Sequence, residues 1–158
     1  MVVLQLILYC LLFTAMVKIG VGVNALNGLY FYPAPYQEKV YELGLTNRET
    51  VQKKKKRFMT SFFTVMLIAL LLVIGLWNGV SAFLPAYLQA LLFLEVMNWY
   101  DGIVIDRLWV GHSSFWNIPG VDLPYVQTWP QVLKKRCILT FIWLAGAAIV
   151  AGLIVLIF

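Results

Sequence analysis

Four apolar runs, each long enough to cross a membrane as a helix, constrain this chain more than any other feature. They lie at about 2–23, 58–79, 82–106 and 137–158. A helix needs about 20 residues to cross the roughly 30 Å hydrocarbon core of a bilayer, and it satisfies its own backbone hydrogen bonds there. The chain is 62% hydrophobic, with a mean hydropathy of +0.85, which is too apolar for an average soluble domain. We therefore predict an all-α integral membrane protein, with 1–158 forming a single transmembrane domain and four-helix bundle.

The first run, 2–23, has an alternative interpretation as a cleaved secretion signal. A signal peptide begins with a basic segment and ends at a small-residue cleavage site. The chain shows no basic residue before this run and no convincing cleavage site after it. We expect the run to be retained as the first membrane helix.

The basic residues predict the orientation of the chain. Of twelve Lys and Arg residues, seven lie in the connection 24–57 and four in the connection 107–136. Basic residues favour the cytosolic side of a membrane, so we expect both connections to be cytosolic and both termini to lie outside the cytosol. The net charge of +5 is then a signal of multi-pass topology in a membrane such as the cell membrane, and nucleic acid is not an expected partner.

A basic block stands directly before the second run. It consists of Lys53, Lys54, Lys55, Lys56 and Arg57. Its simplest role is to anchor the topology. Its alternative role is to bind anionic lipid headgroups, at about 1 kcal/mol for each basic side chain near the surface.

The first connection has signals for a helix of its own. Pro35 can open a short interfacial helix over 35–43, and Gly44 can end it in the left-handed conformation. Thr46 and Glu49 have the spacing of a capping box. We expect the next helix to begin near Asn47 and to continue through the basic block into the second membrane run.

The second connection, 107–136, is rich in tryptophan and proline and has little charge before its end. We expect it to rest on the membrane interface or to fold back under the bundle, either as a lid over a cytosol-facing cavity or as an ordinary loop. The aromatic cluster Tyr30, Phe31 and Tyr32 suits the headgroup layer, and its alternative role is an aromatic ligand platform. In the fourth run, Ala147 and Ala151 have the spacing for close helix packing, within the bundle or in a homo-oligomer.

A polar stripe runs along the third predicted helix. At about 100° per residue, Glu95, Asn98, Gly102 and Asp106 fall within one sector, Trp99 borders it, and Asp101 lies about 60° beyond Asn98. A charged residue at the bilayer centre costs about 2.5–3.5 kcal/mol. Glu95 is therefore expected to face the bundle interior, either in a functional pocket or in a structural hydrogen bond between helices.

The other charged residues near this stripe have two interpretations each. Asp101 can pair with Lys18 if the first and third helices are neighbours. Otherwise Lys18 extends to the headgroups and leaves Asp101 free for a ligand. Asp106 is either part of the site or a solvated charge at the helix end. His112 can fold back toward the acids as a general acid or base, or lie at the interface without a special role.

These residues support three hypotheses of function. In the first, a small polytopic membrane protein binds a lipid-like or small-molecule ligand in a polar, cytosol-open pocket, with transport as an extension that needs oligomers. In the second, an embedded enzyme uses Glu95, Asp101 and His112 as acid and base groups on a lipid-like substrate. In the third, an accessory subunit pairs its polar stripe with a membrane partner protein. No catalytic motif or metal-ligand spacing is present, and no cofactor is indicated. The candidate ligand-binding residues are Glu95, Asn98, Trp99, Asp101, Asp106 and His112.

Overall fold

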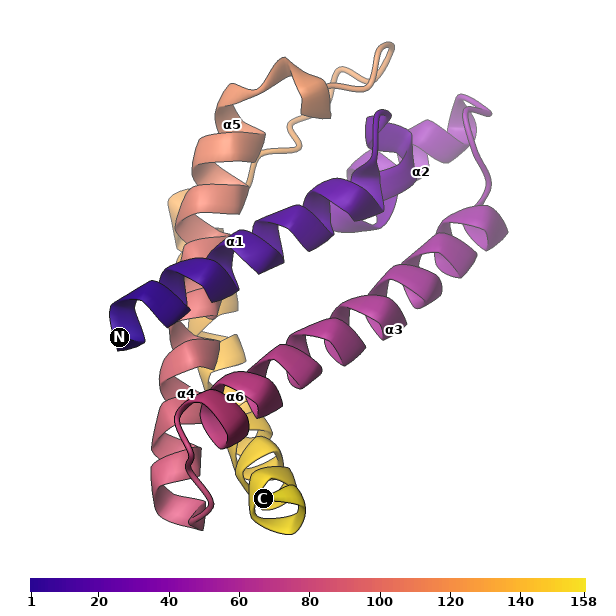
Figure 1. Cartoon of the computed structure of the whole chain (residues 1–158). Coiled ribbons are helices and arrows are strands. Elements are labelled where there is room, and N and C mark those ends of the chain that lie inside the picture. Colours follow the sequence, from indigo (N-terminus) through magenta and orange to yellow (C-terminus); the bar gives the residue numbers. More distant parts are fainter.

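A computed structural model describes residues 1–158 and confirms the predicted all-α bundle (Figure 1). Four helical rods are long and apolar enough to cross a membrane. They are α1 (Val2–Val21), α3 (Arg48–Leu71) with its continuation η2 (Leu72–Trp77), α4 (Phe83–Tyr100) with its continuations η3 (Asp101–Trp109) and α5 (Val110–His112), and α6 (Trp129–Ile157). Both η2 and η3 are π-helical.

The boundaries of the third and fourth rods differ from the prediction. The third rod continues to His112 instead of ending at 106, and α6 begins at Trp129 instead of near 137. The early start of α6 has a local cause, because the side chain of Gln131 accepts a hydrogen bond of 2.9 Å from the amide of Thr128 and Pro130 lies in the first turn. The connection therefore shrinks to 113–128, and the basic residues at 134–136 lie within a helix.

The first connection contains the predicted short helix. It consists of a 3-10 helix, η1 (Ala25–Phe31), followed by α2 (Ala34–Glu42), with Gly44 at a φ of 67° just beyond it. The predicted Thr46–Glu49 capping box is wrong. Instead the side chain of Asn47 accepts a hydrogen bond of 2.8 Å from the amide of Thr50, so α3 begins at Arg48.

The closest helix pair is α4 with α6, and small side chains explain its closeness. Ala86 and Ala90 of α4 and Ala147 and Ala151 of α6 are all completely buried. Side chains of this size let two helix backbones approach. Ala147 and Ala151 therefore pack within the chain, as one of the two alternatives predicted.

The other pair of rods, α1 and α3, lies across this α4–α6 pair (Figure 1). Rings join the rods: Tyr9 of α1 meets Phe93 of α4 at 5.5 Å between centroids, and Phe13 of α1 meets Phe62 of α3 at 5.4 Å. At the end of α3 that leads into α4, Gly75 lies against the ring of Phe158. From there α3 diverges from α6, as Figure 1 shows.

The two long connections pack against each other and form a cap at the end of the bundle that holds the basic segments 53–57 and 134–136. We call this the basic end. The hydroxyl of Tyr32 donates to the carbonyl of Trp116 at 2.7 Å, and the amide of Ile118 donates to the hydroxyl of Tyr36 at 3.1 Å. The second connection thus folds back under the bundle. Because Tyr32 is buried in the cap, its predicted position in the headgroup layer is wrong.

Candidate functional site

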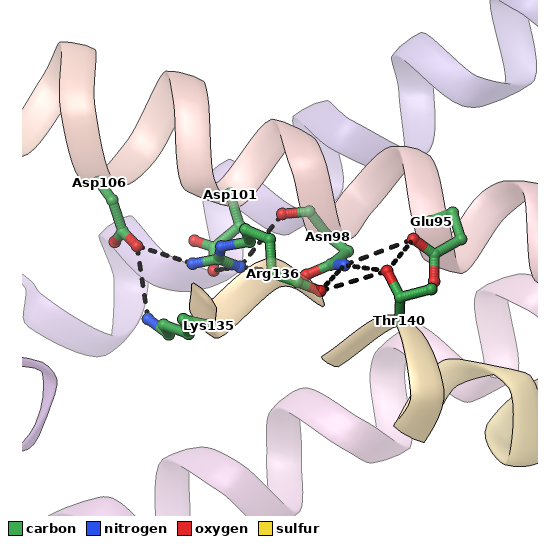
Figure 2. A network of polar contacts seen from close by, with 7 residues as sticks. All are labelled: Glu95, Asn98, Asp101, Asp106, Lys135, Arg136 and Thr140. Carbon is green, nitrogen blue, oxygen red and sulfur yellow. Dashed lines mark hydrogen bonds and ion pairs between the residues drawn. The ribbon is translucent and has the colours of Figure 1, made fainter. Parts of the chain in front are cut away.

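Arg136 of α6 is the centre of a polar cluster at the basic end (Figure 2). Its side chain is 1% exposed. Nη1 donates to Oδ2 of Asp101 at 2.7 Å, and Nη2 donates to Oδ2 of Asp106 at 2.7 Å. Nη1 also donates to the backbone carbonyl of Asn98 at 3.1 Å. One buried guanidinium therefore compensates two carboxylates, which neither acid could tolerate alone at this depth.

The π-helical geometry of η3 brings the two carboxylates to the same guanidinium. Asp101 and Asp106 are five positions apart, and in an α-helix they would be about 140° apart around the axis. In a π-helix the backbone bonds run from residue i to residue i+5, so residues at this spacing stand nearly above each other. Figure 2 shows both side chains reaching Arg136 from one side of the rod.

Gly102 lets the stem of Arg136 lie against η3. A Cβ atom at this position would be 2.8 Å from Nε and 3.0 Å from Cδ of Arg136. Any side chain at 102 would therefore force the guanidinium away from its two carboxylates.

Deeper along the same face, α4 and α6 continue this network. Asn98 is 2% exposed, and its Nδ2 donates to the carbonyl of Arg136 at 3.1 Å. The hydroxyl of Thr140 donates to Oε2 of Glu95 at 2.9 Å, while Oε1 of Glu95 is buried without a partner. The polar stripe thus faces α6 inside the chain, as Figure 2 shows.

Lys18 does not pair with Asp101. Its ammonium lies 4.1 Å from the ring centroid of Phe115 and 5.9 Å from that of Trp109, which are cation–π distances. The predicted ion pair is therefore wrong. The converse expectation, that Asp101 would be left free, is wrong as well, because Arg136 occupies it.

Two of the predicted site residues lie outside the cluster. His112 is exposed, and its Nδ1 lies 3.1 Å from the carbonyl of Leu108 at the end of the rod. Trp99 is 36% exposed on the outer surface of α4. Glu95, Asn98, Asp101 and Asp106 are the predicted residues that the structure brings together.

A cavity of about 260 Å³ lies beside the cluster, between the cap and the rods α1, α3 and α6. Its lining is apolar except at one end. Side chains of α3 and α6, including Phe62, Phe63, Leu139 and Trp143, form much of the apolar wall. The polar end consists of Asn98, Asp101, Asp106, Gln127, Lys135 and Arg136.

Sequence reasoning missed Arg136, Thr140 and Trp143. Arg136 stands beside an apolar run and was assigned to the connection, where basic residues act as topology anchors. The signal that could have placed it correctly is the capping sequence at Thr128 and Gln131, which starts α6 about two turns earlier.

The basic block 53–57 lies on an exposed face of α3. Lys53 pairs with Glu49 at 2.7 Å, and the ammonium of Lys54 donates to Oδ1 of Asn27 at 2.8 Å. These contacts tie the block to its own helix and to η1. Binding of anionic lipid to this block stays a prediction.

No protein-family model, curated protein or solved structure matches the chain. Its class therefore follows from the fold and the site. It is a helical bundle with four rods of membrane-spanning length, in which a buried arginine and two aspartates border an apolar cavity.

Proposed function

We propose that this protein binds a single-chain amphiphile in the cavity. The observation that carries the proposal is the polarity of the lining. Charged and amide side chains such as Asp106, Gln127 and Lys135 gather at one end, and hydrocarbon and aromatic side chains surround the rest. This division matches a molecule with one polar head and one apolar chain.

The size of the cavity favours one chain over two. Its volume of about 260 Å³ is slightly below the roughly 300–1,000 Å³ of common ligand pockets. At roughly 30 Å³ for each water molecule in the liquid, it corresponds to about nine waters. A head with part of one hydrocarbon chain fills such a space, whereas a two-chain lipid exceeds it.

The cavity is also accessible from the side of the bundle. Phe63 lines it and is 53% exposed, and Met59 and Leu139 line it while remaining half-buried. These residues belong to rods of membrane-spanning length. An amphiphile dissolved in the bilayer can therefore enter between α3 and α6 without crossing water.

The two alternative functions have less support. An acid–base enzyme that uses His112 with Glu95 and Asp101 requires these groups to meet, and His112 lies outside the cluster. An accessory subunit requires the polar stripe to face outward, whereas Thr140 and Arg136 occupy it from α6. Transport remains an extension of ligand binding that requires oligomers.

Photo-crosslinking tests the proposal. A long-chain alcohol that carries a photoreactive group and an alkyne handle is added to the protein in lipid nanodiscs, and the labelled residues are identified by mass spectrometry. We expect labels on α3 and α6 residues that line the cavity. Leu139→Trp fills the cavity and should cut this labelling several-fold.

Leu144→Trp is the matched control, because Leu144 lies on α6, is 39% exposed and does not line the cavity. It should label like the wild type. Equal labelling of the two variants, or labels spread evenly over the outer surface, would contradict the proposal.

A further inference from the structure

The formal charges that line the cavity cancel. Asp101 and Asp106 face Arg136 at 2.7 Å each, and Lys135 lies 3.4 Å from Asp106. These four are the only ionised side chains in the lining that pair with one another as two acids and two bases. An anionic head would meet two carboxylates without a free cation, and a cationic head would meet two basic groups without a free carboxylate.

Unpaired hydrogen-bond donors remain in the lining. The indole Nε1 atoms of Trp116 and Trp143 are buried and have no acceptor. An indole N–H can only donate, and a buried donor without an acceptor is unfavourable. The third unpaired donor of the lining, Nε of Arg136, lies against Gly102.

The two indoles belong to different parts of the fold. Trp116 ends the short helix η4 (Ser114–Trp116) in the cap and is 2% exposed, and Trp143 lies about two turns into α6 beyond Arg136. Donors therefore border the cavity both at the cap and along its apolar wall. The other buried polar atoms without a partner, on Tyr9 and Glu95, belong to residues that do not line it.

We infer that the ligand is an uncharged single-chain lipid whose head offers oxygen acceptors, of the monoacylglycerol type. Its ester and hydroxyl oxygens accept hydrogen bonds from the indoles of Trp116 and Trp143, and its hydroxyl hydrogens find acceptors in Asp101, Asp106 and Gln127. This inference rests on the proposed function, because it names the class of ligand for the same cavity.

Three probes with the same hydrocarbon chain test the inference. Glycerol mono-oleate is uncharged, oleate is anionic and oleylamine is cationic. Each is titrated into the protein in phosphatidylcholine nanodiscs, and the indole N–H resonances of isotope-labelled tryptophan are followed by NMR. Trp116→Phe and Trp143→Phe variants assign the two resonances.

We expect glycerol mono-oleate to move the Trp116 and Trp143 resonances downfield, as hydrogen bonding does. The exposed indoles of Trp99 and Trp129 should stay unchanged. Oleate and oleylamine should bind at least about tenfold more weakly. Leu139→Trp should abolish the shifts caused by the uncharged probe.

Each contrary result has its own meaning. Tighter binding of oleate or oleylamine that Leu139→Trp removes would overturn the inferred ligand class and leave amphiphile binding intact. Binding of glycerol mono-oleate without movement of the two buried indole resonances would overturn the inferred hydrogen bonds. Absence of any probe binding sensitive to Leu139→Trp would overturn both this inference and the proposed function.

Discussion

Replacement of Arg136 by methionine tests the charge cluster most directly. Methionine keeps an unbranched apolar stem and removes the guanidinium that bridges Asp101 and Asp106 at 2.7 Å each. Removing one partner of a buried ion pair costs about 3–5 kcal/mol, because the remaining charge stays buried without compensation. We expect Arg136→Met to lower the free energy of unfolding by this amount.

The loss should depend on the two carboxylates and not on the shape of the arginine. Adding Asp101→Asn and Asp106→Asn to Arg136→Met removes all three charges together. Replacing a whole buried ionic group by neutral side chains is often close to neutral in stability. The triple variant should therefore recover more than half of the free energy that the single variant loses.

The assay is reversible unfolding in mixed micelles, with sodium dodecyl sulfate added stepwise and helix content followed by circular dichroism. Lys135→Met is the control, because Lys135 is 44% exposed and 3.4 Å from Asp106, and such surface pairs contribute about 0–1 kcal/mol. The reasoning fails if Arg136→Met is as stable as this control, or if the triple variant is as unstable as the single one.

Four further predictions follow from positions described above. Gly102→Ala should lower the free energy of unfolding in the same assay by about 1–3 kcal/mol, because its Cβ would meet the arginine stem, whereas Gly152→Ala, with open space around its Cβ, should cost nothing; equal losses would contradict this. Deletion of Ile103 should be tolerated better than insertion of an alanine after it, because deletion turns the π-helical spacing of the two aspartates into an α-helical spacing of i and i+4, and thermal unfolding compares the two. Burial raises the pKa of Tyr30 to about 12 from its ordinary 10.0, so the stability that this hydroxyl contributes should be complete below pH 10 and be lost as the pH rises through about 12; denaturation at a series of alkaline pH values should show a shallower loss in Tyr30→Phe. The exposed thiol of Cys137 should react with an impermeant maleimide added from the cytosolic side of oriented vesicles while the buried cysteine stays unlabelled, and labelling from the opposite side would invert the predicted topology.

The membrane fold could be predicted because it depends on features that act over whole segments. A run of about 20 apolar residues has few other stable environments, and Pro35 and Gly44 mark a short helix through their own backbone preferences. The polar face of the third rod could be predicted for the same reason. Glu95 and Asn98 lie too deep in an apolar helix to face lipid.

The partner of this polar face could not be predicted from the same rules. Arg136 lies eight positions beyond the cap at Thr128, and the assumption that basic residues near an apolar run are solvated anchors hid it. The assumption of a uniform α-helix also separated Asp101 from Asp106. A π-helical segment has no clear sequence signal, since it depends on packing between η3 and α6.

The contact between Gly75 and Phe158 gives the α1–α3 pair a pivot at the end of the bundle away from the basic end. From Gly75 to Phe58 the rod is about 25 Å long, at about 1.5 Å per residue. A rotation of about 5° around that pivot moves the far end of the rod by about 2 Å, by the geometry of a rigid lever of this length. Thermal rocking of this size changes the width of the side opening without breaking the ion pairs of Arg136, which join only α6 and η3. The charged cluster can therefore stay rigid while the entrance beside it opens and closes.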